Sequence, residues 1–238
     1  MHSIYDPDTL ARSSGSDFSL SLNRIYNFVY GWMATGLLVS GLVAYFVAQM
    51  FIEQPPPLGL FKICCIVEVL LVLGLSALIH KMPLPLAALT FLAYAALNGV
   101  TLSVVFLVFE LAAIQSVFYI TAGTFAGMAL FGSLTRKNLS GLGRICIMGL
   151  WGIILASIVN FFLGADELQS IISYVGVAIF VGLTAWDAQK VRALAEQQDQ
   201  MDSLTVRRLG LLCALELYLD FINLFLYLLR IFGRKDRS

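Results

Sequence analysis

Four carboxylates lie inside long apolar stretches of this sequence: Glu68, Asp187, Glu216 and Asp220. A carboxylate at the centre of a membrane-spanning helix costs roughly 2.5–3.5 kcal/mol on insertion scales, so such a residue indicates function by default. Carboxylates can share a proton with one another, and their oxygens are the ligands that calcium prefers. The chemistry that this set predicts is therefore proton sensing and the passage of a cation.

Three polar side chains follow one face of the last apolar stretch. Glu216 and Asp220 are four residues apart, and Asn223 comes three residues later, so all three share a helix face. Such a polar stripe must contact protein or water, because lipid does not accept it. We therefore expect the helix over 209–232 to be surrounded by the other helices.

A structural role is an open alternative for two of the acids. Asp187 lies near the end of its apolar stretch and could pair with Lys190 or Arg192 at the cytoplasmic interface. Glu68 could serve structure or function equally. No basic residue lies within two turns on the N-terminal side of Asp220, so an ion pair explains Asp220 less well.

Seven apolar stretches can position these acids. The 238 residues are 59% hydrophobic and only 13% charged, whereas soluble domains average about 25% charged residues. About 20 apolar residues span a bilayer as a helix. We predict an all-α integral membrane protein with a disordered cytoplasmic tail over 1–23, a transmembrane domain over 24–233 and a basic C-terminal tail over 234–238. A short amphipathic helix on the membrane surface is the alternative for residues 1–23. The seven expected helices cover about 25–51, 58–79, 84–109, 113–134, 143–164, 169–188 and 209–232.

Basic residues indicate the orientation, because Lys and Arg are retained on the cytoplasmic side. The first, third and fifth connections hold only Lys62. We therefore predict a cytoplasmic N-terminus. Seven crossings would put the C-terminus outside, although four basic residues cluster there, so charge counting leaves that side open. The ten basic residues of the N-terminal segment and the even-numbered connections are Arg12, Arg24, Lys81, Arg136, Lys137, Arg144, Lys190, Arg192, Arg207 and Arg208.

Two segments carry a family resemblance. The sequence over 180–190, Phe-Val-Gly-Leu-Thr-Ala-Trp-Asp-Ala-Gln-Lys, and the sequence over 217–225, Leu-Tyr-Leu-Asp-Phe-Ile-Asn-Leu-Phe, resemble the signature of the Bax inhibitor-1 family, the transmembrane Bax-inhibitor-motif proteins. The segment 94–103 is similar to the third helix of the bacterial inner-membrane members. The likeness runs from about residue 24 to residue 233.

The resemblance implies seven transmembrane helices with the last helix in the middle of the bundle. It also implies that Asp187 and Asp220 face each other as a carboxylate pair. Family members are described as pH-sensitive calcium leak channels in which this pair is the pH sensor, near the cytoplasmic side of a closed pore. Asp187 and Asp220 would then also be ligands for passing calcium, with Asn98 and Asn223 in support.

Elementary electrostatics supports such a sensor. Two carboxylates that are close together in a low dielectric cannot both ionise cheaply, so the pair is expected to share one proton. Loss of that proton leaves two like charges that repel. Gating then needs only two helix arrangements that differ by a few kcal/mol.

The sequence departs from the family at the second helix. Bacterial relatives often carry an Arg near its end that can latch the carboxylate pair, whereas this chain has His80 and Lys81 there. Neither side chain offers the bidentate fork of Arg. The sequence therefore does not decide whether a latch exists or at which pH the pore would close. Glu216 adds a third acid near the pair.

The main alternative is a membrane regulator without channel activity, which would bind and modulate an ATP-dependent membrane protease through residues 1–23. Deleting that segment would then abolish protease modulation and leave ion flux intact. A second alternative is a proton-coupled transporter with Asp187, Glu216 and Asp220 as a relay, but the paired broken helices typical of such proteins are missing from the sequence.

Other function classes find little support. The sequence lacks the Gly-x-Ser-x-Gly, His-Glu-x-x-His and phosphate-loop patterns, so we expect no enzyme and no cofactor. Intramembrane aspartyl hydrolysis usually has a Gly-rich segment beside one Asp, which is absent. The four cysteines have no Cys-x-x-Cys spacing that would suggest zinc. The expected partners are the lipid bilayer, calcium and protons; no basic patch suits nucleic acid. We interpret the Gly-x-x-x-Gly pair, Gly123 and Gly127, as packing within the bundle, with dimerisation as the alternative.

Overall fold

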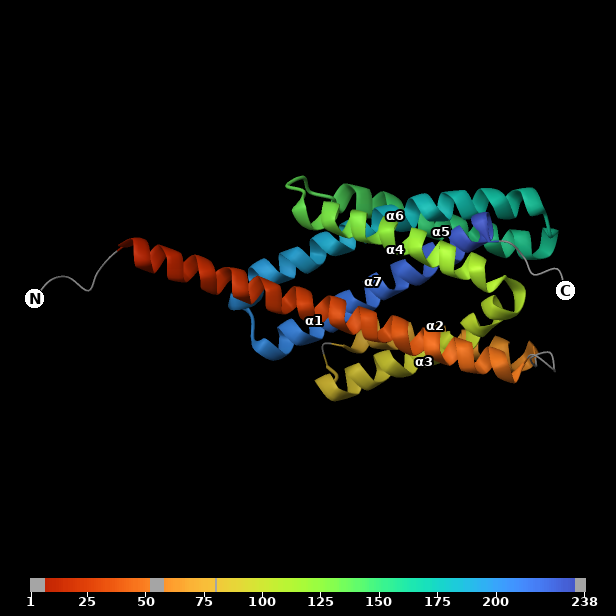
Figure 1. Ribbon diagram of the computed structural model, residues 1–238, viewed down its shortest axis with the longest axis horizontal. Helices are drawn as coiled ribbons and strands as arrows, with labels where there is room; N and C mark the ends of the chain where they lie inside the picture. The colour runs from red at the N-terminus through yellow and green to blue at the C-terminus, as the bar shows by residue number, and fades with distance from the viewer. Residues whose placement is uncertain (1–6, 52–57, 80, 234–238) are drawn as a thin grey trace, which may run out of the picture.

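The computed structural model describes residues 7–51, 58–79 and 81–233, and side chains are not considered for 7–22, 58 and 60–62. The chain folds there into α-helices, with one short 3-10 turn before the last of them (Figure 1). The elements are α1 (Pro7–Met50), α2 (Leu58–Leu78), α3 (Leu84–Val108), α4 (Leu111–Leu134), α5 (Ser140–Leu163), α6 (Asp166–Gln197), η1 (Gln198–Gln200) and α7 (Ser203–Phe232).

Six helices in the described residues are long and apolar enough to cross a membrane. They are the Asn23–Met50 part of α1 and the helices α3, α4, α5, α6 and α7. The apolar segment Ile63–Leu78 of α2 is shorter than these six. Large apolar side chains cover the outside of the bundle; Phe161 is 84% exposed and Phe162 is 80% exposed. Such a surface is stable in lipid and not in water.

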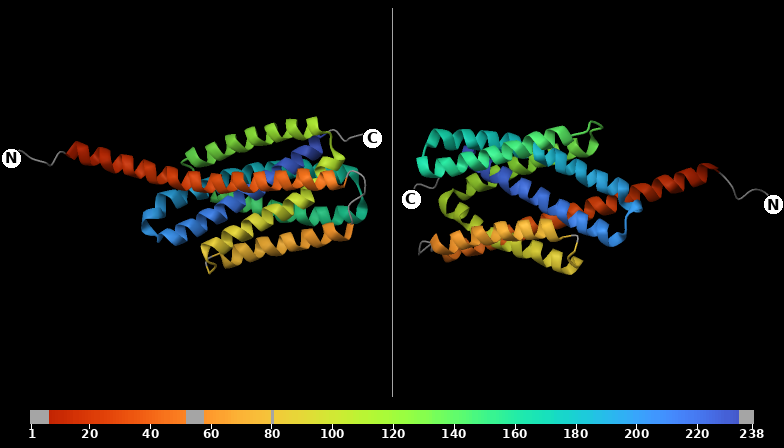
Figure 2. Two further views of the ribbon diagram at one scale, coloured as in Figure 1. Left: turned by 60° about the horizontal axis from the view of Figure 1, so that its bottom comes forward. Right: turned by 180° about the vertical axis from the view of Figure 1, so that it is seen from behind.

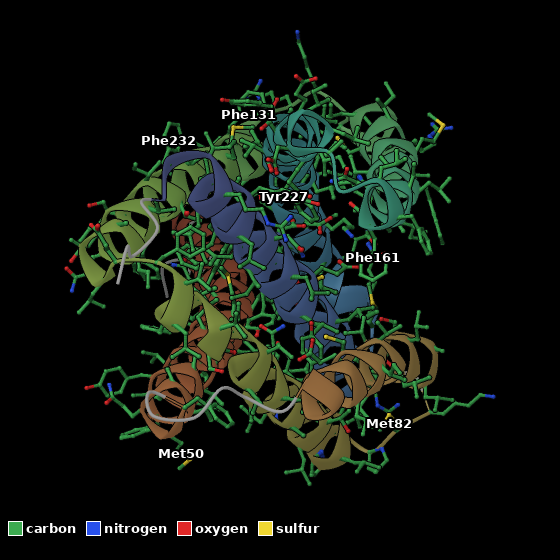
Figure 3. All side chains as sticks on the ribbon, turned by 90° about the vertical axis from the view of Figure 1, so that its right-hand side faces the viewer. Met50, Met82, Phe131, Phe161, Tyr227 and Phe232 are labelled. Atoms are coloured by element: carbon green, nitrogen blue, oxygen red, sulfur yellow. The ribbon has the colours of Figure 1, made fainter. Side chains whose placement is uncertain are left out.

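Helix α7 is the most buried of these six candidate spans. In its most apolar stretch 61% of the residues are buried, against 17% in α5. It packs on α6, α1, α4 and α3. In Figure 3, which looks along the bundle, Tyr227 of α7 lies among the helices whereas Met50 of α1 lies at the edge. The burial of α7 agrees with the polar stripe, because its acids require protein around them.

Two outer helices are attached to the bundle through a single neighbour each. Helix α5 packs extensively only on α6, and α2 only on α3. The α2–α3 pair and the α5–α6 pair lie on opposite sides of α7 (Figure 1 and the right-hand view of Figure 2). The acids of α7 therefore lie where two helix pairs meet.

Helices α6 and α7 extend beyond the apolar stretches that predicted them. Helix α6 runs to Gln197 and α7 begins at Ser203, so most of the polar connection expected over 190–208 is helical. Hydropathy marks where a helix leaves the membrane, and the Ala, Leu, Glu, Gln and Arg of this segment are good helix formers. Asp202 caps α7 by accepting a hydrogen bond from the Thr205 amide at 2.8 Å, which lowers the pKa of Asp202.

Helix α1 begins at Pro7, where the sequence predicted a disordered tail over 1–23. Figure 1 shows its first turns extending beyond the other helices. Once the apolar stretch has formed a helix, each added residue avoids the cost of nucleation, and Pro is favoured at a first helical position. Residues 1–6 and the predicted basic tail over 234–238 lie outside the described residues.

The Gly-x-x-x-Gly pair does not mediate packing within the bundle, so that interpretation was wrong. A Cβ atom added to Gly123 or Gly127 would meet nothing within 4 Å. Close approach occurs instead at Gly132, where a Cβ would overlap the Ala185 carbonyl, and at Gly143, where it would overlap the Trp186 ring. These two glycines bring α4 and α5 against α6 just before Asp187. Spacing alone could not show which glycines face a neighbour.

Candidate functional site

Asp187 of α6 and Asp220 of α7 come together in the fold. Asp187 is 6% exposed and Asp220 is 4% exposed. Both side chains line the same cavity, and Oδ2 of Asp220 has no hydrogen-bond partner among the described residues. A hydrogen bond between two carboxyl groups needs a proton on one of them, because an ionised carboxylate can only accept. The packing of α6 on α7 therefore brings two buried carboxyl groups to one cavity, as a proton-sharing pair requires.

Lys190 is the cation beside these acids. Its Nζ atom lies 2.8 Å from Oδ1 of Asp187, one turn earlier on α6, and 2.7 Å from Oε2 of Glu216 on α7. The ammonium group also lies 4.4 Å from the centroid of the Trp186 ring. Asp187 therefore belongs both to the carboxyl pair and to an ion pair with Lys190. Sequence spacing allowed the pair with Lys190 but gave no sign of the link to Glu216, which joins two helices.

The acids line a cavity of about 500 Å³. Its walls come from α2, through residues such as Val72, and from α5, through residues such as Ile154. The side chains of the lining that carry polar groups are Glu68, Tyr94, Asp187, Glu216, Asp220, Asn223 and Tyr227. The acids that the sequence singled out, and Asn223, thus share one cavity.

Glu68 contributes to this cavity from α2. Its Oε1 atom accepts a hydrogen bond from Oγ1 of Thr101 on α3 at 2.9 Å. This hydrogen bond joins α2 to α3 beside the cavity. Asn223 donates to the Leu219 carbonyl oxygen of its own helix at 2.8 Å, so its amide helps to keep α7 regular.

A buried hydrogen-bond network joins α7 to α1 and α3 near the cavity. Tyr218 is fully buried, and its hydroxyl donates to Oδ1 of Asn98 at 3.0 Å. The same hydroxyl lies 2.7 Å from Oγ of Ser40, and that Oγ atom also lies 2.7 Å from the Ala95 carbonyl oxygen, so the single Ser40 proton can serve either contact. Sequence reasoning proposed Asn98 but missed Ser40 and Tyr218. Serine and tyrosine are common in transmembrane helices, so neither was conspicuous.

Tyr218→Phe is expected to lower the thermal stability of the purified protein. The change leaves the Asn98 oxygen without its buried donor, which costs roughly 1–3 kcal/mol. Tyr94→Phe is the matched control, since Tyr94 packs edge-on against Tyr218 at a ring-centroid distance of 5.9 Å, and no hydrogen bond of its hydroxyl is found among the described residues. Thermal unfolding in detergent compares the two variants. Equal losses would show that ring packing, and not the network, is what Tyr218 provides.

Of the two candidate latch residues, only Lys81 can be placed in the structure. Lys81 is exposed at the α2–α3 connection and is not among the residues that line the cavity. His80 lies outside the described residues. The cation that contacts Asp187 is Lys190, from the same helix.

The described residues contain no group of three or more His, Cys, Asp or Glu side chains arranged to hold a metal ion. Asp187 and Asp220 offer oxygens from two helices, and the Lys190 ammonium occupies one side of Asp187. A cation that coordinates Oδ1 of Asp187 would compete with Lys190 for that atom. Calcium binding by this pair stays a prediction.

Comparison with known proteins places this site in a family context. The sequence model of the family described as "Inhibitor of apoptosis-promoting Bax1" matches residues 22–237. The chain is 45% identical to the inner membrane protein YbhL of Escherichia coli over 214 residues, which is 87% of this chain and 90% of that protein. It is 40% identical to an uncharacterised protein of Borreliella burgdorferi, covering 90% of this chain and 93% of the other. An uncharacterised protein of Rickettsia prowazekii is 33% identical, with 97% and 98% covered.

Proposed function

The chain belongs to the Bax inhibitor-1 family, and on that premise we propose that it is a pH-sensitive calcium leak channel of the inner membrane, gated by Asp187 and Asp220. The observation that carries this proposal is that two buried carboxyl groups, on two helices, line one cavity together with further acids. The inner-membrane location is inferred from the relative YbhL, which is an inner membrane protein.

The gating step is a change in protonation. With one shared proton, the hydrogen bond between Asp187 and Asp220 holds α6 against α7. Without that proton the two carboxylates repel, and α6 and α7 are driven apart. The other ionisable groups at the cavity are Lys190 and Glu216 on the same two helices, Glu68 on α2, and Tyr94 and Tyr227. Helix α5 contributes only the apolar Leu150 and Ile154 to the lining, so the charge balance is set by α2, α6 and α7.

The cavity acids also suit the permeating ion. Calcium takes several oxygen ligands, and carboxylates supply them. Lys190 sits where a calcium ion on Asp187 would sit, so ion entry and the Lys190 ion pairs exclude one another. The lysine thus acts as an internal counterion in the closed state, and calcium replaces it during passage.

We extend the proposal to the topology: seven crossings, with α2 as the second, α7 in the middle and the N-terminus cytoplasmic. Support comes from the burial of α7 and from Figure 1, where α1 begins and α7 finishes at opposite ends of the molecule. The basic connections expected on the cytoplasmic side follow α2, α4 and α6, and Figure 1 shows them at the end where α1 begins.

Calcium efflux from proteoliposomes between about pH 5 and pH 8 tests this function, in the range where carboxyl pairs with a shared proton titrate. The wild-type protein is expected to leak more calcium as pH rises, because the shared proton is lost. Asp187→Asn and Asp220→Asn should each flatten the pH profile, since an amide cannot lose that proton. Asp166→Asn is the control, because Asp166 is exposed in the first turn of α6, far along the helix from the cavity.

A pH profile that survives both amide substitutions would refute the gating role of the pair. If wild-type protein showed no flux at any pH, the channel proposal itself would fail. The regulator of an ATP-dependent membrane protease would then be the better reading.

A further inference from the structure

A second cavity, of about 480 Å³, lies where α4 ends, α5 begins and α6 continues past Asp187. The connection between α4 and α5 that forms one wall lies at the end of the molecule where α1 begins (Figure 1). Unlike the acid cavity, this one is lined mainly by polar and basic groups. Its lining comprises Thr135, Arg136, Lys137, Asn138, Ser140, Trp186, Gln189, Lys190, Arg192, Ala193 and Glu196.

The charge of this basic cavity favours an anion. Four cationic side chains line it against one acid, Glu196. That acid is neutralised by Arg192, whose Nε atom lies 2.7 Å from Oε1 of Glu196. Lys190 is engaged with Asp187 and Glu216. Arg136 and Lys137 are exposed, and no ion pair of either is found in the described part of the chain. Two cations are therefore free to meet a ligand.

Hydrogen bonds fix the walls of this cavity, whereas the side chains of Arg136 and Lys137 are exposed. Arg192 donates from Nη1 to the carbonyl oxygens of Ser133 at 3.1 Å and Thr135 at 3.3 Å, which fixes it against the end of α4. Gln189 accepts from the Leu139 amide at 2.8 Å and donates to the Lys137 carbonyl at 2.9 Å. The connection that carries Arg136 and Lys137 is thus tied to α6 on both sides, and the walls are formed in advance.

The start of α5 adds a second source of positive potential. Leu139 precedes its first turn, and that turn contains no acid. The amides of Leu139 and Ser140 are hydrogen-bonded to Gln189 and Asn138. The helix dipole and the remaining amides of the first turn favour an anion there. The helix end and the basic side chains therefore favour the same kind of ligand.

The surface beside the cavity is apolar and faces outward. Leu134 at the end of α4 is 74% exposed, Ile145 in the second turn of α5 is 63% exposed, and Leu142 is 38% exposed. Trp186 lines the cavity itself, and Trp is enriched at the membrane–water interface. A ligand with an anionic group in the cavity and apolar chains along α5 would satisfy both surfaces.

We propose that this basic cavity binds the phosphate headgroup of an anionic membrane phospholipid. Arg136 and Lys137 contact the phosphate, the α5 N-terminus faces it, and the acyl chains lie on Leu134, Leu142 and Ile145. Basic pockets between helices at the membrane surface suit such headgroups, and Arg matches the geometry of phosphate oxygens. The binding does not depend on ion flux, so it stands or falls separately from the channel.

Thermal stabilisation of the detergent-purified protein by added lipid tests this site. Phosphatidylglycerol is expected to stabilise the wild type more than phosphatidylcholine does. The double variant Arg136→Gln/Lys137→Gln should raise the phosphatidylglycerol concentration for half-maximal stabilisation about thirtyfold, given the usual gain per basic residue near anionic lipid. Lys81→Gln/Arg207→Gln is the matched control, because it removes two exposed cations that do not line the cavity.

Two further outcomes overturn the proposal. If both double variants weaken the response equally, the lipid recognises overall charge and not this cavity. If soluble glycerol 3-phosphate stabilises the wild type as well as phosphatidylglycerol does, the site takes a free phosphate and not a lipid. Both variants change exposed side chains, and an unchanged elution volume and lipid-free unfolding temperature confirm that each is folded.

Discussion

Lys190→Met is expected to move the rise in calcium efflux toward alkaline pH by about one pH unit or more. A cation within hydrogen-bonding distance favours the ionised form of a carboxyl group, typically by 1–3 pH units. Lys190 lies 2.8 Å from Asp187 and 2.7 Å from Glu216, so its removal leaves three neighbouring acids without a counterion. The pair then keeps its shared proton to a higher pH, and the closed state persists with it. Efflux from proteoliposomes across a pH series measures the shift.

Three companion variants make this result specific. Lys190→Arg keeps the charge and should leave the efflux midpoint near that of the wild type. Arg207→Gln removes an exposed cation from the start of α7 and should have no effect. Lys81→Met tests the latch that the family resemblance suggested. A shift caused by Lys81→Met and not by Lys190→Met would show that the wrong lysine has been assigned.

Gly132→Ala should strongly destabilise the protein although it is a conservative change in a helix. In an exposed helix this substitution normally stabilises by up to about 1 kcal/mol. At Gly132 the new methyl group would overlap the backbone carbonyl of Ala185, which cannot rotate away as a side chain can. Helices α4 and α6 must separate, and overpacking of this kind costs about 1–3 kcal/mol. Because Ala185 precedes Asp187 by two residues, the shift also disturbs the carboxyl pair.

Gly127→Ala is the matched control for this prediction. It lies in the same helix, and its added methyl group would meet nothing within 4 Å. Thermal unfolding in detergent should show a loss for Gly132→Ala, by several degrees, and no loss for Gly127→Ala. Equal unfolding temperatures for the two variants would contradict the close approach of α4 to α6.

The helices were largely predictable from the sequence because the bilayer imposes their length. Each of the seven apolar stretches overlaps one helix of the structure, and most predicted helix ends lie within a few residues of the observed ones. The errors lie where hydropathy carries no information. Outside the membrane, the extensions of α1, α6 and α7 depend on helix propensity and on the continuation of an existing helix.

The acids of the candidate site could be predicted from the sequence, but the contacts that join them to other helices could not. Asp187, Glu216 and Asp220 were conspicuous because a carboxyl group is rare at membrane depth, and helical spacing placed the last two on one face. Lys190 was considered only as a partner on its own helix. The ion pair between Lys190 and Glu216 and the hydrogen bond between Tyr218 and Ser40 each join residues far apart in the sequence. Such contacts depend on how helices rotate against one another, which a single sequence does not specify.

The single-neighbour attachment of α2 and α5 makes the width of the acid cavity adjustable. Each helix forms one wall, and either could lean outward while the packing of α7 on α1, α4 and α6 stays intact. The force that opposes such leaning comes from the surrounding acyl chains. In the proposed channel, lateral pressure in the bilayer would then act directly on the width of this cavity. The length of the lipid chains and the membrane tension would therefore affect ion flux, as pH does.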